Sequence, residues 1–328
     1  MFSYILRRFL YMILLLVLAS VVSFLIIVLP PGDFLTSYIN QLESQGTHVT
    51  VDLAIALRRQ YGLDQPIYMQ YLKWSWKMLH GDMGRSFQWQ RPVSELINER
   101  LPMTLVVSFL SLIVEYVIAI PIGIYSAVRQ YSIGDYFFTV MGFIGVSVPN
   151  FLLALVLIVW LYKTVGISAA GLYSAQFKGE PWSFAKVVDL IKHLPLPIIV
   201  IGMSGTAYTI RVMRGMMLDE LNRPYVTTAR AKGLAETRLL LKYPVRVAMN
   251  PIVSTIGWSL PNIFSGATIA AIVLGLPTIG PILYQALQQQ DMFLAASTVM
   301  VITALTIIGT LISDILLAWL DPRIRLGD

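Results

Sequence analysis

The chain has 328 residues, of which 56% are hydrophobic and only 13% are charged, against about 25% charged residues in soluble domains. The charges are absent from whole stretches and gather between them, which excludes a soluble globular enzyme, a disordered protein and a coiled coil and indicates a polytopic membrane protein. The net charge of +6 is typical of membrane proteins with basic cytoplasmic loops, so no nucleic-acid partner is expected.

Six segments are long and apolar enough to cross a bilayer, because a helix rises about 1.5 Å per residue and the hydrocarbon core is about 30 Å thick. The expected spans are 9–29, 103–128, 136–162, 193–213, 250–275 and 294–320. The first exceeds the apolar core of a cleavable signal, so it is expected to stay in the protein. The sequence therefore predicts an all-α polytopic membrane protein with six transmembrane helices.

The region from Val247 to Gln290 carries no formal charge and is too long for a single span. Pro261, Gly275, Pro277, Gly280 and Pro281 are expected to break it. One span followed by a bent or re-entrant extracytoplasmic segment is the simplest interpretation.

The distribution of Lys and Arg predicts that both termini are cytoplasmic, because six spans place them on one side. Arg7 and Arg8 lie at one end of the chain and Arg323 and Arg325 at the other. The segment between spans four and five is also expected on this side, since eight cations fall in or beside it: Arg211, Arg214, Arg223, Arg230, Lys232, Arg238, Lys242 and Arg246.

Residues 31–100 form the longest segment between expected spans and are predicted to lie outside the cytoplasm. A segment of this length is expected to fold, and its Tyr68, Tyr71, Trp74 and Trp76 suit a helix at the level of the lipid headgroups. The segment could serve as a docking site for a binding protein or as a structural cap, and the structural role is favoured.

Residues 219–246 are predicted to form a pair of short helices joined by a tight corner. Pro224 fits a first helical turn, Gly233 fits a left-handed stop after a helix, and Pro244 ends a second helix that begins near Ala235. Binding of anionic lipid headgroups would explain the basic charge. It would not explain the small residues spaced at Ala229, Ala231 and Gly233, which permit close approach to another protein.

Three polar residues are expected inside spans: Glu115, Asn150 and Asp314. Intramembrane acids suggest function by default, but for Glu115 and Asp314 structural pairing at an interface with a second membrane subunit is favoured. Asn150 follows a break at Ser147-Val148-Pro149, where carbonyl groups could meet a solute. A plain proline kink is the favoured interpretation of that break.

No catalytic machinery is apparent. The chain has no cysteine and only three, widely separated histidines, so no metal site and no nucleophile are expected. It also lacks the Gly-x-x-x-x-Gly-Lys-Ser/Thr loop that cradles nucleotide phosphates. The protein is therefore not expected to be an enzyme, and no cofactor is expected.

The stretch from Tyr225 to Gly233 resembles the EAA loop of ABC importer permeases. Thr227-Thr228-Ala229 stands where that family has Glu-Ala-Ala, Gly233 matches the glycine of the pattern, and the later Ile-x-Leu-Pro part is not met near Tyr243. In the family this loop docks into the ATP-binding subunit. The resemblance implies that coupling to the ATPase depends on Tyr225, Thr227, Thr228, Ala229, Arg230, Ala231, Lys232, Gly233 and Leu234.

Further strings along nearly the whole chain resemble the B-type subunit of peptide/nickel-type importer permeases. Their order and spacing together are specific, although each alone is weak. They are Tyr4 to Arg8, Pro31 to Asp33, Tyr61 to Pro66, Gly81 to Ser86, Glu99 to Leu105 and Leu320 to Arg325.

The resemblance implies the type I ABC importer transmembrane fold in a bacterial or archaeal cytoplasmic (inner) membrane. The expected partners are a homologous second permease in a heterodimer, ABC ATPase subunits on the cytoplasmic side, an extracytoplasmic solute-binding protein and the lipid bilayer. Residues 1–30 would be an N-terminal span, 31–100 the extracytoplasmic segment and 101–328 a five-helix permease core. ATP hydrolysis is expected on the partner subunits, which would drive alternating access.

Many members of the family that this chain resembles carry an acid in span five, and this chain has Ala271 at that position. A path without that carboxylate favours a neutral solute, and hence an oligosaccharide over a peptide. The alternative function is an ion-coupled secondary transporter, which would need internal repeats and cavity-facing acids. No repeat is evident, and Glu115 and Asp314 are the acids available to it.

Overall fold

The computed structural model describes residues 2–29, 55, 59, 64–86, 88–166, 170–177 and 179–320. Every regular element in these residues is a helix, and one isolated bridge joins Arg85 to Pro92. The chain divides into two compact units, which are described in turn. Unit 1 holds residues 1–9, 103–281 and 308–328, and unit 2 holds residues 10–102 and 282–307.

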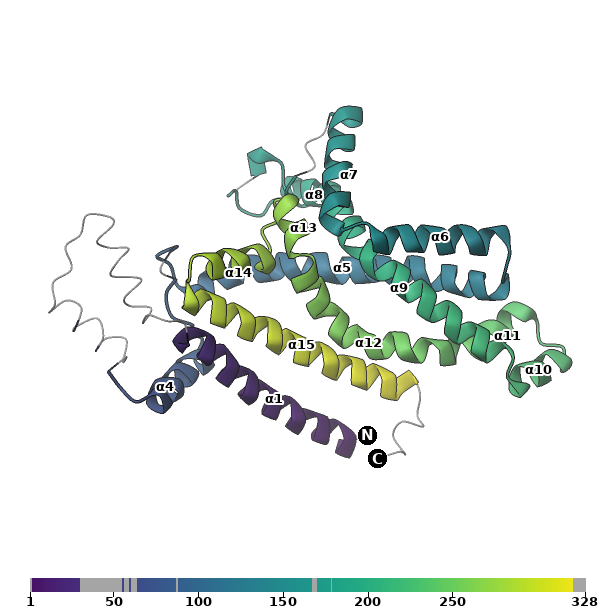
Figure 1. Cartoon of the computed structure of the whole chain (residues 1–328), viewed down its shortest axis with the longest axis horizontal. Helices are drawn as coiled ribbons and strands as arrows, with labels where there is room; N and C mark the ends of the chain where they lie inside the picture. Colours follow the sequence, from purple (N-terminus) through teal and green to yellow (C-terminus); the bar gives the residue numbers. More distant parts are fainter. Residues whose placement is uncertain are drawn as a thin grey trace. The chain divides into compact units, whose positions relative to one another are not determined.

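The long helix α9 (Pro195–Leu221) is the centre of unit 1. Its most extensive packing is against α6 (Ile133–Ser147), α7 (Asn150–Val165) and α12 (Pro244–Gly266) (Figure 1). α9 also approaches α5 (Val93–Val128) closely, because a Cβ added at Gly202 would lie 3.0 Å from the Ser111 carbonyl oxygen. Small residues commonly permit such approaches between membrane helices.

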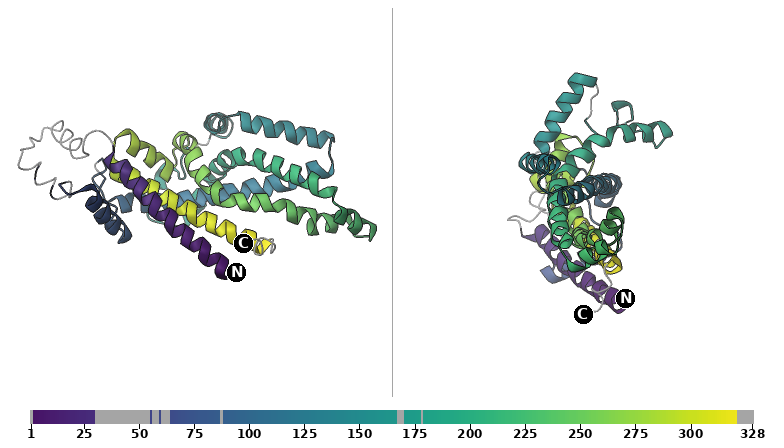
Figure 2. Two further views of the ribbon diagram at one scale, coloured as in Figure 1. Left: turned by 60° about the horizontal axis from the view of Figure 1, so that its bottom comes forward. Right: turned by 90° about the vertical axis from the view of Figure 1, so that its right-hand side faces the viewer.

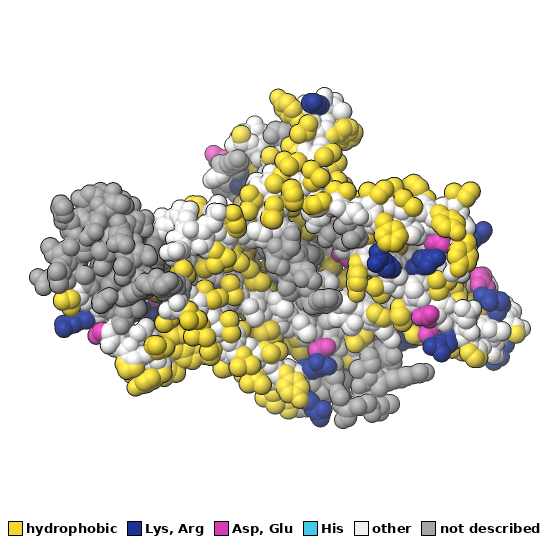
Figure 3. Space-filling view, in the orientation of Figure 1, with side chains coloured by type: hydrophobic (Ala, Val, Ile, Leu, Met, Phe, Trp, Pro, Cys, Tyr) yellow, Lys and Arg dark blue, Asp and Glu magenta, His cyan; other side chains and the backbone are white. Residues whose placement is uncertain are grey.

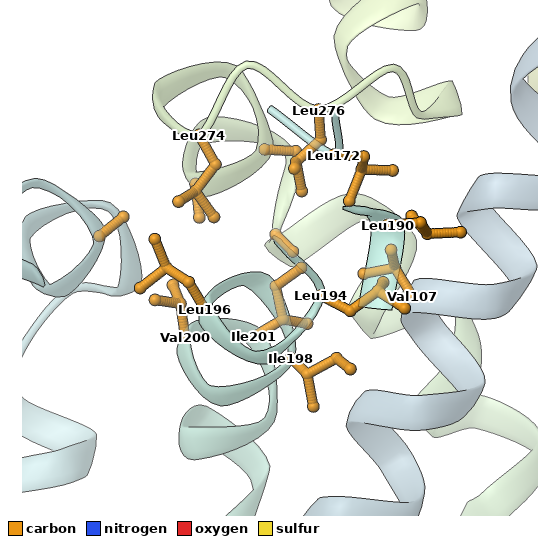
Figure 4. Close-up of a cluster of buried hydrophobic side chains, with 14 residues drawn as sticks. Val107, Leu172, Leu190, Leu194, Leu196, Ile198, Val200, Ile201, Leu274 and Leu276 are labelled. Atoms are coloured by element: carbon orange, nitrogen blue, oxygen red, sulfur yellow. The ribbon is translucent and has the colours of Figure 1, made fainter. Parts of the chain in front are cut away.

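Unit 1 has two main hydrophobic cores along α9. In the first, Val107 of α5 and Ile201 of α9 pack with Leu190 of α8 (Phe184–His193) and with Leu274, which follows α13 (Thr268–Val273) (Figure 4). In the second, Met213 and Met217 of α9 are fully buried against α5 and α12. The two cores fix the start and the end of α9 against its neighbours.

Unit 2 is built around parts of α1 (Phe2–Val28) and α15 (Met292–Leu320), which lie side by side in Figures 1 and 2. The short helix α4 (Ile67–Leu79) packs against both. Phe24 of α1, Trp74 of α4 and Ala296 of α15 are buried together. The Ser86 hydroxyl donates a 2.5 Å hydrogen bond to Asp291, which precedes α15.

Among the described residues, three helices are long and apolar enough to cross a membrane: α1, α5 and α15. α6 and α7 meet at a bend of 100° and together would form a fourth span. The fourth and fifth expected spans correspond to α9, of 27 residues, and α12, of 23 residues. The all-helical class is confirmed, while the count of six spans and the cytoplasmic termini stay predictions.

Several expected boundaries were wrong. α5 begins at Val93, ten residues before the expected start, since a membrane helix can continue beyond the hydrocarbon layer. α12 runs through Pro261, which does not break it. Gly280 and Pro281 lie in the first turn of α14 (Ile279–Gln288), where proline costs no hydrogen bond. The predicted break therefore falls at Gly275, whose φ is +64°, and at the following Pro277.

The segment expected at 31–100 is described only in part. The predicted aromatic helix is α4, which contains Tyr68, Tyr71, Trp74 and Trp76. The motif strings at 31–33, 61–63 and 321–325, the last with the Arg323 and Arg325 used for the topology, lie outside the described residues.

Candidate coupling surface and intramembrane residues

The corner predicted between spans four and five follows the end of α9. α10 (Pro224–Ala231) begins at the predicted proline, and Gly233 has the left-handed φ of +75°. α11 (Glu236–Lys242) follows, and α12 begins at Pro244. The predicted pair of short helices is confirmed, because the residues that start and stop them are local signals in the backbone.

The corner has a small hydrophobic core of its own. Val226 and Ala229 of α10 are buried with Leu239 of α11, and Leu234 and Tyr243 pack against them. On the surface, the Arg230 guanidinium donates hydrogen bonds of 2.7 and 3.2 Å to the Glu236 carboxylate. This pair joins α10 to α11 across the Gly233 turn.

The remaining predicted coupling residues form the outer face of the corner. Ala229 is buried and Leu234 is half-buried, so these two hold the corner together rather than face a partner. A Cβ at Gly233 would meet no atom within 4 Å, so conformation and not space requires glycine there. The exposed members are Tyr225, Thr227, Thr228, Arg230, Ala231, Lys232 and Gly233.

The outer face is strongly basic. Lys232, Arg238 and Lys242 are exposed beside Arg230, whose hydrogen bond lowers the pKa of the Glu236 carboxyl below its ordinary value of 4.5. The Tyr225 hydroxyl donates to the buried Glu220 carboxylate. Partial burial and this acid raise the pKa of Tyr225 to about 12, so it remains a donor at neutral pH.

An ion pair that the sequence did not reveal joins the neighbouring helices. Arg214 of α9 donates to both carboxylate oxygens of Asp135 at the start of α6, over 2.9 and 2.8 Å. The Ser132 hydroxyl caps α6 by accepting from the Asp135 N–H. Arg214, one of the cations expected in or beside the cytoplasmic segment, lies within α9, two turns before the corner. The spacing Ser132-x-x-Asp135 is typical of a helix start and signals the beginning of α6, but it does not identify Arg214 as the partner.

Glu115 lies in α5 and its partners belong to the same chain. Thr209 of α9 donates a 2.6 Å hydrogen bond to its carboxylate, and the residue is 6% exposed. A Cβ at Gly205 would lie 2.1 Å from the Glu115 carboxylate, so this glycine makes the space that the acid occupies. Within this chain the acid therefore lies in the packing between α5 and α9, and its pairing at an interface with a second subunit stays a prediction.

Asp314 also pairs inside the chain. Its carboxylate lies 3.2 Å from the Arg8 guanidinium, so the basic start of α1 meets the end of α15. Asn150 is half-buried as the first residue of α7, directly after the break at Val148 and Pro149. With a bend of 100°, that break is larger than the expected proline kink.

Ala271 lies on the wall of a small cavity within unit 1. The cavity has a volume of about 20 Å³, enough for about one water molecule. Thr104 and Ser108 of α5, Ile201 of α9 and Thr278 also line it. The Thr104 hydroxyl accepts a 2.9 Å hydrogen bond from the Ile279 N–H, which ties α5 to the start of α14. The lining residues are apolar or hydroxylic, and none is charged.

Comparison with known proteins covers almost the whole chain. Residues 119–326 match the family described as "Binding-protein-dependent transport system inner membrane component", and residues 1–108 match the N-terminal model of such membrane components. The oligopeptide transport system permease protein AppB of Bacillus subtilis is 36% identical over 99% of this chain and all of its own length. The dipeptide permease protein DppB of Escherichia coli is 31% identical over 82% of this chain and 84% of its own.

Proposed function

Because the chain belongs to the family of binding-protein-dependent transport system inner membrane components, we propose that it forms half of a translocation path driven by partner ATPase subunits. The family places it in the inner membrane as a multi-pass protein. The observation that supports coupling is the exposed basic corner of α10 and α11, which carries Gly233 at its turn.

The proposed assembly has four kinds of component. A homologous second permease would complete the path, a solute-binding protein would deliver the solute outside, and ATPase subunits would bind the corner in the cytoplasm. Residues 1–30, 31–100 and 101–328 would serve as first span, extracytoplasmic segment and permease core. ATP hydrolysis would take place on the partner subunits, since this chain has no phosphate-binding loop.

The contacts of the corner would pass a movement of α10 and α11 on to α9 and α12. α10 and α11 share a core, so a partner that moves one moves the other. α9 leads directly into α10, and α12 follows α11. α9 is joined to α6 by Arg214 and Asp135. Movement of the corner would therefore tilt α9 and α12 and alternately open the path to either side.

A short peptide is the proposed solute class, on the strength of relatives named as oligopeptide and dipeptide permeases. The uncharged Ala271, at the position where the resembled family carries an acid, is the observation that favours a neutral oligosaccharide instead. Competition of labelled tripeptide uptake by unlabelled peptides and oligosaccharides separates the two. Inhibition by oligosaccharides alone would overturn the peptide proposal.

Ion-coupled transport without an ATPase is the alternative function. It would require Glu115 or Asp314 to exchange ions with a cavity. Glu115 is buried against Thr209, and Asp314 faces Arg8, so both acids already have structural partners. These contacts favour the ATP-driven proposal.

The test uses two substitutions at Gly233 in the full complex. Gly233→Trp places a large side chain on the outer face, at a position where a Cβ meets no described atom within 4 Å. Gly233→Asn is the matched control, because asparagine tolerates a positive φ and adds little bulk. ATPase subunits should co-purify with the wild type and with Gly233→Asn, and should be lost or uncoupled from transport in Gly233→Trp.

Equal recovery and equal solute-stimulated ATP hydrolysis for all three proteins would overturn coupling through this corner. A chain that purifies alone and drives uptake in vesicles without ATPase would overturn the importer proposal itself.

A further inference from the structure

α4 has two apolar faces, and only one of them packs inside the protein. Tyr71, Trp74 and Met78 face α1 and α15 in unit 2. A second stripe is formed by Tyr68, Leu72, Trp76 and Leu79, whose exposed fractions are 66%, 58%, 66% and 81%. Their spacing of four, four and three residues places them on one side of the helix. Figure 3 shows hydrophobic side chains exposed over α4.

A third face of α4 is cationic. Lys73 and Lys77 are exposed one turn apart, and at about 100° per residue they lie beside the stripe rather than within it. Lys77 has one acid nearby, Asp82, at 3.8 Å. A short helix with an exposed apolar stripe, aromatic residues and flanking lysines has the composition of a helix that lies in a membrane interface.

The contacts of α4 with α1 indicate how deep α4 lies in the bilayer relative to the end of the first expected span. The Tyr71 hydroxyl is 2.8 Å from that of Ser20, and the Phe24 ring lies 5.5 Å from Tyr71 and 5.8 Å from Trp74. The rings meet α1 at Phe24, five residues before Leu29, the end of the expected span, and therefore about 8 Å below that end; the Tyr71 hydroxyl reaches deeper, to Ser20, about 14 Å below it. Interfacial helices bury their apolar faces by about 5–10 Å at this boundary.

We propose that α4 is an interfacial helix of the extracytoplasmic leaflet. Tyr68, Leu72, Trp76 and Leu79 contact the acyl chains of the bilayer, and Lys73 and Lys77 contact phospholipid phosphates. The outward apolar residues of α1, among them Leu14 and Leu18, continue the same lipid-facing surface. This inference rests on the topology proposed above, in which α1 spans the membrane.

The absence of cysteine from the chain permits a direct test. Single cysteines are introduced at Leu72 and at Lys73, adjacent positions on different faces, and at Leu14 as a marker of the span. Each is spin-labelled in the assembled complex in phospholipid nanodiscs, where collisions with oxygen and with a water-soluble nickel chelate are measured. The label at Leu72 should collide mainly with oxygen, and the label at Lys73 several-fold more with the chelate.

The marker separates failure of this inference from failure of the topology. If the label at Leu14 lies in lipid while the label at Leu72 collides mainly with the chelate, α4 faces water and the proposal is overturned. Protection of an aqueous Leu72 label by added solute-binding protein would make α4 a protein dock instead. An aqueous label at Leu14 would overturn the span and the inference together. Leu79→Cys repeats the measurement on the same stripe if Leu72→Cys does not assemble.

Discussion

At the scale of single residues, the contact between α5 and α9 depends on glycine. Gly205 faces the Glu115 carboxylate so closely that a Cβ would lie 2.1 Å from it. Gly215, in the same helix, would place a Cβ in open space. The two glycines therefore provide a comparison in which helix propensity is matched and only the neighbour differs.

We predict that Gly205→Ala destabilises the protein by about 1–3 kcal/mol, because Glu115 or the helix must move. Gly215→Ala should stabilise it by about 0.4–1 kcal/mol, as alanine is the better helix former. Thermal unfolding of the purified protein measures both. The cost of Gly205→Ala should shrink in a Glu115→Ala background, and equal costs in the two backgrounds would contradict the contact.

The largely buried ion pair of Asp135 and Arg214 is a second contact in which the loss of one side chain should reduce stability. The Asp135 side chain is 3% exposed and the Arg214 side chain 27%. Removal of one partner from a fully buried pair costs about 3–5 kcal/mol, and the partial exposure of Arg214 reduces this.

Asp135→Asn is therefore predicted to cost about 2 kcal/mol, since it leaves the guanidinium without a carboxylate. Asp219→Asn, which alters an exposed acid of α9, is the matched control and should cost less than about 0.5 kcal/mol. The thermal unfolding midpoints of the two variants check this. Similar midpoints would contradict a stabilising role for the pair.

At the scale of elements, local signals and distant contacts differ in how well sequence predicts them. Pro224, Gly233 and Pro244 act on the backbone around them, so the corner was predicted to within two residues. The contact of Asp135 with Arg214 joins positions 79 residues apart, and no local pattern identifies it. Pro261 shows the converse, because a proline signal did not stop α12 in its packed surroundings.

The stability of the corner should also depend on pH, through the ionisation of Glu236. Its folded pKa lies below the ordinary 4.5 because Arg230 donates to it. The contribution to stability is therefore complete above about pH 4.5 and is lost as pH falls through the lowered value. Hydrogen exchange of residues 224–242, corrected for intrinsic rate, should show slightly greater protection in wild type than in Glu236→Gln near pH 7. The two should converge below that pKa, and a difference that persists in acid would contradict the assignment.

At the scale of the whole molecule, composition identified the class of protein, while the arrangement of spans needs an independent measurement. α1, α5 and α15 meet the requirements of length and apolarity. α9 carries Arg211 and Arg214 within its length, and two cations in one helix weaken the hydropathy on which span prediction depends. The basic corner and the segment around α8 are expected on opposite sides of the membrane.

Single cysteines at Lys232 and at Gln176, both exposed positions, test the topology without removal of native thiols, since the chain has none. In sealed cells, a membrane-impermeant maleimide should label Gln176→Cys and leave Lys232→Cys unmodified. In inverted vesicles the pattern should reverse, because six spans with cytoplasmic termini put the corner inside and residues 163–192 outside. Labelling of both from the same side would mean that α9 does not cross the membrane, which would contradict the six-span topology on which the cytoplasmic position of the corner depends.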